Sequence, residues 1–184
     1  MRVNARKLML FLLALAACPR PANAAGAVLT EIDGVTSSVF QRDQSSFSGL
    51  GIRLRIHPPQ LADGLTIVPM LEYWRNKSTI KKFGIESTRK DATLGGFLGY
   101  DFRREGWHPY VGAGVAMHFL SSEVDAPTLG LDNASDSIIK GGLLLVGGVN
   151  FGLAGNLGNL LELEYHHLPD QSQLKFNWGL SWAF

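Results

Sequence analysis

The sequence predicts an all-β fold, an eight-stranded antiparallel up-and-down transmembrane β-barrel. From about Val28 to the last residue, bulky apolar residues alternate with small or polar ones, and Gly, Pro, Asn and Asp interrupt the pattern at fairly even intervals. The 184 residues include 21 glycines, 10 phenylalanines and 4 tryptophans, and only 18% are charged, which is typical of strands and tight turns. About eight alternating segments can be counted, an even number, as single-chain bacterial barrels require.

The residues before the first strand indicate export. Met1–Lys7 carries Arg2, Arg6 and Lys7 and is followed by the apolar run LMLFLLALAA, which is too short to span a bilayer. With cleavage after the sequence Ala-Asn-Ala that ends at Ala24, residues 1–24 are expected to form a secretory signal peptide and residues 25–184 the barrel domain.

The single cysteine allows a second interpretation of this region. Leu15–Cys18, with the sequence LAAC, resembles the lipobox of bacterial lipoproteins, which would keep Cys18 as a lipidated N-terminus. Cleavage after Ala24 would instead remove Cys18 and leave the exported protein without a thiol. Stability would then come from backbone pairing and packing, because no disulfide could form.

The first half of the barrel contains four predicted strands, within 28–40 and over 49–57, 65–75 and 93–102. In the segment GLGIRLRIH, residues 49–57, every second residue from Leu50 to Ile56 is apolar. Arg53 and Arg55 lie on the opposite face of the same strand, because successive side chains of a strand point to opposite sides. Each of these strands therefore has one bulky apolar face and one small or polar face.

The second half contains four more, over 110–119, 138–151, 159–167 and 174–184. In the last of them, FNWGLSWAF sets Phe176, Trp178 and Leu180 against Asn177 and Gly179. No stretch in this half or the first has a convincing helical period. The chain is therefore expected to consist of strands and their connections.

The connections alternate in character. The links HPPQLADG, RREGWH and AGNLGN are short and turn-like, whereas 76–90 and 121–137 are longer and polar, and 41–46 and 168–171 are brief. In an up-and-down barrel with both termini on the periplasmic side, the three short turns lie at the periplasmic rim. The other four links face outward, which is the usual asymmetry of such barrels.

The direction of the apolar faces separates a membrane barrel from a soluble lipocalin-like binder. An eight-stranded barrel has an interior just wide enough to be filled by side chains. If the apolar faces pointed inward, this space would have to hold Phe176, Trp178 and Trp182 together with the apolar rows of all other strands. They would not fit, so the apolar faces are expected to meet lipid, and strands of about ten residues match the hydrocarbon thickness. In lipid the sheet must then close, because every backbone polar group needs an internal partner.

Two segments resemble known proteins. Asn177, Gly179, Trp182 and Phe184 match the pattern polar-x-Gly-x-x-hydrophobic-x-aromatic that ends bacterial outer-membrane barrels and is recognised by their assembly machinery. Gly99–Phe119 is similar to a hairpin of the small outer-membrane β-barrel family that includes OmpA-type, OmpX-type and opacity-type proteins, in which a Tyr-Asp-Phe strand leads through a turn into Pro-Tyr-Val-Gly-Ala-Gly.

The resemblance implies a place in the bacterial outer membrane. It implies contact with outer-membrane lipid and lipopolysaccharide, and with the barrel assembly machinery and periplasmic chaperones during biogenesis. The chain is expected to differ from OmpA proper, because no C-terminal peptidoglycan-binding domain is predicted. A structural or surface-interaction role is therefore expected, in the manner of the small OmpA-like and OmpX-like proteins, and no extracellular partner can be named.

If the apolar faces meet lipid, the charged side chains of the strands point into the lumen. Charges brought inside must pair, because an unpaired one costs several kcal/mol as an order of magnitude. The preferred interpretation is a salt-bridge network that plugs the lumen, and the alternative is a narrow channel for small solutes. The predicted polar network of the lumen contains four positive and four negative residues: Arg53, Arg55, Lys140 and Lys175 with Glu72, Asp101, Glu162 and Glu164.

A cluster at the end of the seventh strand raises the alternative of an enzyme. ELEYHHLPDQS contains His166, His167, Asp170 and Ser172, and the lipid A deacylases, a related barrel family, use a Ser-His-Glu set on the outer wall. Their serine stands two residues after their histidine, where this chain has Leu168 or Pro169, so no catalytic residues are predicted. A metal site on the two adjacent histidines is not expected, because neighbouring strand residues diverge. No cofactor is predicted.

Aromatic residues near strand ends are expected to form girdles at the two membrane interfaces. The residues assigned to the girdles are Tyr73, Trp74, Phe102, Trp107, Phe151 and Phe184.

The formal net charge of +1 argues against a nucleic-acid surface.

Overall fold

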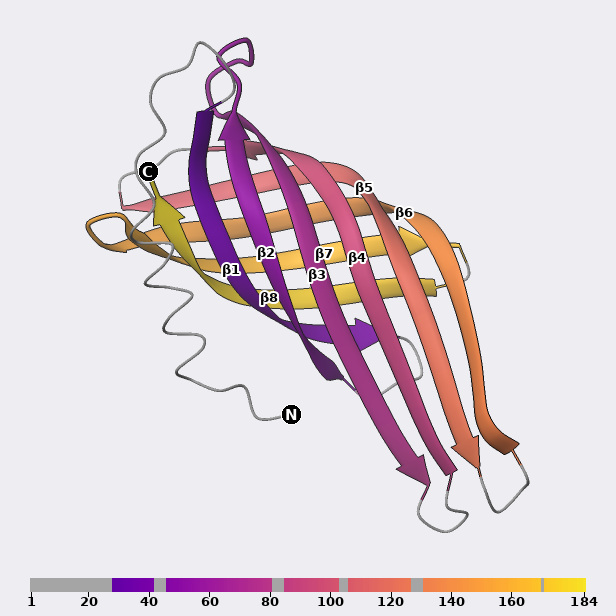
Figure 1. The fold of residues 1–184 in the computed structure, drawn as a ribbon. Helices are drawn as coiled ribbons and strands as arrows, with labels where there is room; N and C mark the ends of the chain where they lie inside the picture. The colour runs from indigo at the N-terminus through magenta and orange to yellow at the C-terminus, as the bar shows by residue number, and fades with distance from the viewer. Residues whose placement is uncertain (1–27, 42–45, 81–84, 103–105, 127–130, 170) are drawn as a thin grey trace.

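The computed structural model is a closed antiparallel barrel (Figure 1), which confirms the predicted fold class. It describes residues 28–41, 46–80, 85–102, 106–126, 131–169 and 171–184, so the predicted signal peptide and Cys18 lie outside the described residues. Each strand pairs with the next one along the chain, and β8 pairs with β1. The eight strands are β1 Val28–Gln41, β2 Phe47–His57, β3 Leu65–Ile80, β4 Ile85–Asp101, β5 Trp107–Ala126, β6 Leu131–Ala154, β7 Leu157–Leu168 and β8 Gln171–Ala183.

The first and last strands close the barrel. Their register runs from Glu31 opposite Ala183 to Gln41 opposite Gln173. Beyond this ladder, the backbone N–H of Phe184 donates to the carbonyl of Thr30 at 3.0 Å. Closure leaves neither β1 nor β8 with an open edge over these residues, which a sheet in hydrocarbon requires. Among the described residues, no helix is long and apolar enough to span a membrane.

Three short connections lie at one end of the barrel, which we call the turn end. They link β2 to β3, β4 to β5 and β6 to β7, and each contains a glycine with a positive φ: Gly64 at 84°, Gly106 at 78° and Gly155 at 56°. Only glycine adopts such angles without steric cost, so these positions fix where the chain reverses. The opposite end, where β1–β2, β3–β4, β5–β6 and β7–β8 connect, is called the loop end.

The two faces of the sheet have opposite character, as the sequence predicts. Leu71 and Trp178 on the outer face are 52% and 47% exposed, whereas Arg53 and Lys175 on the inner face are fully buried. A water-soluble protein would show the reverse, because large apolar patches on a soluble surface are unfavourable. The outer face therefore suits contact with acyl chains, and the lumen holds the charges.

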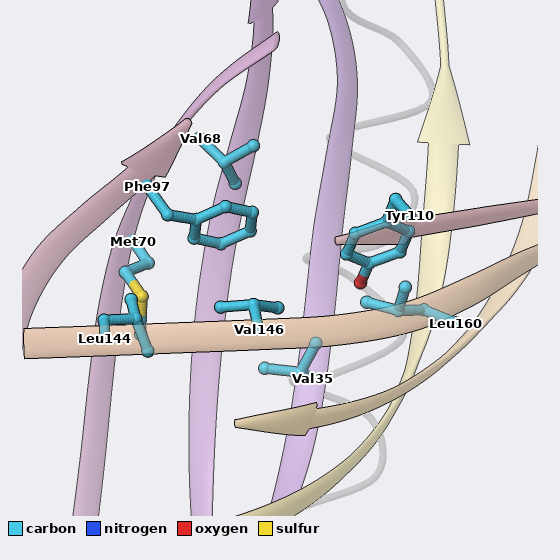
Figure 2. Packing of buried hydrophobic residues seen from close by; sticks show 8 residues of the cluster. All are labelled: Val35, Val68, Met70, Phe97, Tyr110, Leu144, Val146 and Leu160. Carbon is cyan, nitrogen blue, oxygen red and sulfur yellow. The ribbon is translucent and has the colours of Figure 1, made fainter. Parts of the chain in front are cut away.

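The lumen is not wholly polar. Eight buried side chains from β1 and β3 to β7 pack together inside the barrel (Figure 2): Val35, Val68, Met70, Phe97, Tyr110, Leu144, Val146 and Leu160. A second cluster contains Val39, Phe47 and Trp74, and the rings of Phe47 and Trp74 lie 4.3 Å apart between centroids. The assignment of Trp74 to an interfacial girdle is therefore wrong, because it lies on the same inward face of β3 as Glu72 and is 3% exposed.

The predicted long polar loops 76–90 and 121–137 are wrong for most of their length. They are strand, because β3 continues to Ile80, β4 begins at Ile85, β5 continues to Ala126 and β6 begins at Leu131. Figure 1 shows β3 to β6 running well past the ends of the other strands. We call this four-stranded part, residues 75–80, 85–90, 121–126 and 131–137, the extension. Its pairing is hidden in the sequence because both faces are polar there, so the apolar alternation stops while the strands continue.

We expect Gly114→Ala to destabilise the barrel severely. A methyl group at Gly114 would overlap the carbonyl oxygen of Gly96 on β4, whereas a methyl at Gly147 would meet nothing within 4 Å. Overpacking of this kind costs about 1–3 kcal/mol or more. Urea unfolding in lipid vesicles, followed by the heat-modifiable shift in gel migration, should show this loss for Gly114→Ala and less than about 0.5 kcal/mol for Gly147→Ala. Equal stability of the two variants would contradict the packing described.

Candidate functional site

The candidate site is the polar network inside the barrel. Its side chains project inward because they occupy alternate positions of their strands, so that every second residue faces the lumen. Arg53 and Arg55 come from β2, Glu162 and Glu164 from β7, and Lys175 from β8. Closure of the sheet brings these strands around one narrow space.

Arg53 is the centre of the network. Its Nη2 donates to Oε1 of Glu72 at 2.9 Å, and the same guanidinium forms ion pairs with Glu162 through Nη1 and with Glu164 through Nη2. Lys175 pairs through Nζ with the second carboxylate oxygen of Glu72. All five side chains are at most 3% exposed. We call Arg53, Glu72, Glu162, Glu164 and Lys175 the Arg53 cluster.

The network continues from this cluster toward the turn end. Tyr110 donates its hydroxyl to Glu162, and Asn177 Nδ2 donates to the same carboxylate at 3.0 Å. Arg55 lies over the ring of Tyr110, 4.4 Å from its centroid, and donates from Nε to Asp33 Oδ2 at 3.1 Å. The charges are therefore hydrogen-bonded across strands that are far apart in sequence, as buried polar groups require.

Toward the loop end, the network passes through two histidines. His166 Nε2 lies 3.0 Å from Glu164 Oε2, and its Nδ1 lies 3.1 Å from Nε2 of His118. The other ring nitrogen of His118, Nδ1, lies 2.7 Å from Asp91 Oδ2. A continuous chain of polar contacts thus runs through the lumen from Asp91, by way of Arg53, to Tyr110.

The buried charges of the described lumen do not balance. Five acids face three bases, an excess of two acids, when both buried histidines are counted as neutral. An uncompensated buried charge is costly, so this excess calls for bound protons or a cation. The acids are Asp33, Glu72, Asp91, Glu162 and Glu164, and the bases are Arg53, Arg55 and Lys175.

The structure separates the eight residues of the predicted lumen network into two groups. Arg53, Arg55, Glu72, Glu162, Glu164 and Lys175 lie buried within the barrel and join the polar contacts just described. Asp101 lies at the turn end, half-buried, with Oδ1 3.8 Å from His108 Nδ1. Lys140 lies toward the loop end, where its Nζ donates to the carbonyl of Pro169 at 3.3 Å. Alternation places both Asp101 and Lys140 on inward faces, but the two residues lie at the ends of the lumen.

Sequence reasoning missed several members of the network. Alternation places His118 on the inward face of its predicted strand, although His118 is not among the predicted charged residues of the lumen, and Asp91 lies between the predicted loop 76–90 and the predicted strand 93–102. Alternation places Tyr110, His118 and Asn177 on the inward faces of their strands, and this pattern could have identified them as members of the network. No pattern in the sequence predicts the contact between His118 and His166, because the two residues are 48 positions apart.

The residues of the predicted assembly signal lie at the closing seam and the turn end. Asn177 is fully buried and contacts Glu162, and Gly179 approaches the backbone of Gly34 so closely that a methyl group there would overlap its carbonyl oxygen. Trp182 lies opposite Ile32 on β1, and Phe184 is anchored by its backbone bond to Thr30. Each position therefore also has a structural role, and recognition by the assembly machinery stays a prediction.

A cavity of about 370 Å³ opens at the turn end of the network. Its walls include Glu31, Arg55, His57, Asp101 and Tyr110, so it is lined by both signs of charge. Arg55 and Tyr110 also belong to the network, and the cavity therefore ends against it. The arrangement offers a polar vestibule to small solutes.

Ser172 and His167 are neighbours on the outer wall. They face each other across the β7–β8 pair, with Ser172 Oγ 3.4 Å from His167 Nδ1, and Tyr165 donates its hydroxyl to Ser172 at 3.1 Å. This contact was not expected from the sequence, because a turn with Pro169 separates the two residues. Within the described residues, no carboxylate contacts His167, and Asp170 lies outside them. Among the described side chains, none therefore supplies the carboxylate that orients the histidine in hydrolases of this kind.

Glu72, Glu164 and His166 are the described residues that come closest to a three-ligand metal set. Their ligand atoms lie within 4.8 Å of one another, and all three are buried. Both carboxylates, however, are already held by cations, Glu72 by Lys175 and Arg53 and Glu164 by Arg53. A metal ion would have to displace these ion pairs to bind this set.

Comparison with known families gives one match. The profile of the family described as Opacity family porin protein matches residues 71–181, which is more than half of the chain. The matched part runs from within β3 to residue 181, near the end of β8, and includes every member of the Arg53 cluster except Arg53 itself. A search of curated proteins found no match.

Comparison with solved structures supports the same fold. The attachment invasion locus protein Ail of Yersinia pestis, solved with the heparin analogue sucrose octasulfate, is 15% identical, with 86% of this chain and 99% of that chain covered and a TM-score of 0.60. Neisserial surface protein A is also 15% identical, with 88% and 98% covered and a TM-score of 0.59. A major outer membrane protein from Thermus thermophilus is 14% identical, with 84% and 99% covered and a TM-score of 0.58.

Removal of the Arg53 side chain is expected to cost far more stability than removal of a surface cation. Arg53→Ala leaves Glu162 and Glu164 buried without their ion-pair partner, which costs about 3–5 kcal/mol. Lys77→Ala breaks an exposed ion pair with Glu86, 2.6 Å long, which is worth about 0–1 kcal/mol. Urea titration of the refolded barrels measures both free energies of unfolding. Similar losses in the two variants would contradict a central role for Arg53.

Proposed function

The chain belongs to the opacity family of porin proteins and is a β-barrel of the bacterial outer membrane, and we propose that it is a plugged barrel that displays its extension at the cell surface for interaction with other proteins. The proposal has two parts. The lumen network closes the barrel to solutes, and the extension supplies the interaction surface. The second part rests on a single observation, the pairing of β3 to β6 beyond the rest of the barrel.

The extension is suited to interaction because it is an open sheet. The last pair between β2 and β3 is Gly49 with Trp74, and the first between β6 and β7 is Leu143 with His167. In the described part of the chain, residues 75–80 of β3 and 131–137 of β6 therefore have a strand neighbour on one side only. Unpaired backbone groups at such an edge bind an extended polypeptide as an additional strand.

The two edges are not equivalent. The edge of β3 carries Arg75 and Lys77, and charged side chains, lysine especially, discourage strand addition. The edge of β6, LDNASDS over 131–137, contains neither lysine nor arginine, and its charged residues are the two short acids Asp132 and Asp136. We therefore assign the binding of an extended polypeptide to the edge of β6.

Ion pairs on the outward face hold the extension in shape. Lys77 pairs with Glu86 at 2.6 Å between β3 and β4, and Lys90 pairs with Glu123 at 2.9 Å between β4 and β5. The hydrogen bond from Lys90, together with its charge, lowers the pKa of Glu123, so the second pair persists as the pH falls into the mildly acidic range. A sheet that keeps its shape loses less conformational entropy on binding.

The charge of the extension favours a polypeptide over a polyanion. Its four cations, Arg75, Lys77, Arg89 and Lys90, are interspersed with acids such as Glu86 and Glu123. The solved complex of the Yersinia pestis protein contains a heparin analogue, so sulfated saccharides are the second class of ligand to test. The mixed charge predicts weaker binding of such a ligand than of an uncharged extended peptide.

The remaining parts of the proposal concern biogenesis and chemistry. Residues 1–24 direct export, and Asn177, Gly179, Trp182 and Phe184 serve as the signal read by the barrel assembly machinery. The finished barrel contacts outer-membrane lipid and lipopolysaccharide through its apolar outer face. Catalysis is not part of the proposal, because Ser172 and His167 lack an orienting carboxylate in the described chain.

The plug predicts a low conductance. In planar bilayers, the wild-type barrel should give no steady current of nanosiemens size, because the Arg53 cluster fills the narrow lumen between the vestibule and the loop end. A variant with Arg53, Glu162 and Glu164 all replaced by serine should conduct more, since three long side chains are removed together with their charges. Steady nanosiemens currents through the wild type would favour the alternative of a small-solute channel.

The β6 edge predicts a loss of peptide binding when the β5–β6 hairpin is shortened. Ser121 and Ser137 are opposite each other, so a two-residue turn can replace residues 122–136 without disturbing the register below. Peptides selected from a display library on the wild-type barrel should bind this variant at least tenfold more weakly, whereas a matched deletion of residues 77–88 in the β3–β4 hairpin should retain them. Sucrose octasulfate serves as the polyanionic probe.

The result that would contradict this part of the proposal is specific. If the library yields no binders, or if the binders survive loss of residues 122–136, the edge of β6 is not the interaction surface. Stronger binding of sucrose octasulfate than of any peptide would indicate that the ligand of the extension is a sulfated saccharide.

A further inference from the structure

We propose that His118 and His166 form a binding site for a divalent transition-metal ion inside the lumen. The two rings come from β5 and β7, which are separated by β6 in the sheet, and both side chains are fully buried. Nε2 of His118 and Nδ1 of His166 face each other at 3.1 Å, with the ring planes 80° apart. The inference does not rest on the role proposed for the extension.

Each histidine is oriented as metal ligands usually are. The outer nitrogen of His118, Nδ1, contacts Asp91 at 2.7 Å, and the outer nitrogen of His166, Nε2, contacts Glu164 at 3.0 Å. A histidine that binds a metal typically donates its other ring N–H to a carboxylate in this way, which fixes its tautomer and makes the free nitrogen a better ligand. With both outer nitrogens donating, the two inner nitrogens are left with lone pairs on the same side of the lumen.

The separation of the inner nitrogens suits a shared ion. Two imidazole ligands at about 2.0–2.1 Å from a tetrahedral metal lie about 3.3–3.4 Å apart. The observed separation is 3.1 Å, so an adjustment of a few tenths of an ångström is sufficient. This movement requires no change of strand register.

A third donor lies beside the pair. Gln173 is the strand partner of His166 on β8 and is fully buried. Its Nε2 is 3.4 Å from Asp91, and its carbonyl oxygen Oε1 has no hydrogen-bond partner in the described structure. A buried acceptor without a partner is costly, and coordination to a metal ion would satisfy it.

The charge of the lumen is matched by one dication. The buried acids exceed the buried bases by two, and a single proton shared between His118 and His166 would supply only one positive charge. A divalent ion would supply both. Imidazole nitrogen with amide oxygen suits copper, zinc or nickel, and copper(II) binds such donors most tightly.

This pairing differs from the one that the sequence suggested. His166 and His167 are adjacent in the chain, but His167 faces the outer wall and contacts Ser172. The stagger of the strands instead brings the ring of His118 into contact with the ring of His166. His167 is therefore the natural control.

The test is copper binding by the folded full barrel in lipid nanodiscs, followed by electron paramagnetic resonance. The wild type should bind one copper(II) ion per barrel with two imidazole nitrogens resolved in the spectrum, and zinc(II) should displace it. His118→Gln and His166→Gln should each lose this signal, and His167→Gln should keep it. Asp91→Asn, which removes the carboxylate that orients His118, should weaken affinity by about 10–100-fold.

Heat-modifiable gel migration identifies any variant that has not folded, and the wild-type spectrum decides the question without variants. A wild-type barrel that shows no nitrogen-coordinated copper would overturn the proposal in favour of a shared proton. The same conclusion follows if the signal survives in the folded double variant His118→Gln, His166→Gln.

Discussion

The need to pair every backbone polar group in a medium without water determines this structure. A sheet in hydrocarbon has to close on itself, and with eight strands the closed cylinder is only wide enough for side chains. The bulky row of β8, which includes Phe176 and Trp178, must therefore lie outside, and Lys175 and Asn177, which alternate with this row, must lie inside. Once inside, Lys175 requires Glu72, and Glu72 also binds Arg53. The lumen network is thus a consequence of closure as much as a functional device.

Closure also explains where the closed barrel gives way to the open sheet of the extension. Within the band that meets lipid, β3 to β6 show alternating apolar residues, ending at Tyr73, Phe119 and Ile139 on the loop side. Beyond this row the outward positions are Arg75, Lys90, Ser121 and Ser137, and the strands continue as an open sheet, because water can satisfy its edges. On β3 the pairing with β2 ends at Trp74, beside the last lipid-facing residue Tyr73, whereas on β6 the pairing with β7 already ends at Leu143, on the turn side of Ile139. The same chain therefore provides a sealed barrel and an exposed surface for strand addition.

Much of this could be predicted from the sequence, because alternation reports directly on which side of a lipid-facing strand each residue lies. The number of strands and the inward direction of Arg53 and Glu164 follow from it. The extension could not be found this way, since neither face of residues 75–80 or 131–137 is apolar. The position of a side chain along the barrel axis could not be predicted either. Asp101 and Lys140 point inward, as expected, but lie near the two ends of the lumen. The meeting of His118 with His166 depends on strand stagger, which local sequence does not encode.

The central claim is that the bulky apolar faces of the strands point outward to lipid and the polar faces point into the lumen. Two tryptophans test this claim most directly. Trp178 is 47% exposed on the outer face and Trp74 is 3% exposed inside the lumen. Barrels in which Trp107, Trp182 and one of these two tryptophans are replaced can be folded into vesicles whose acyl chains carry bromine, which quenches tryptophan fluorescence on contact. The account predicts strong quenching of Trp178 and almost none of Trp74. Quenching of Trp74 with protection of Trp178 would contradict it.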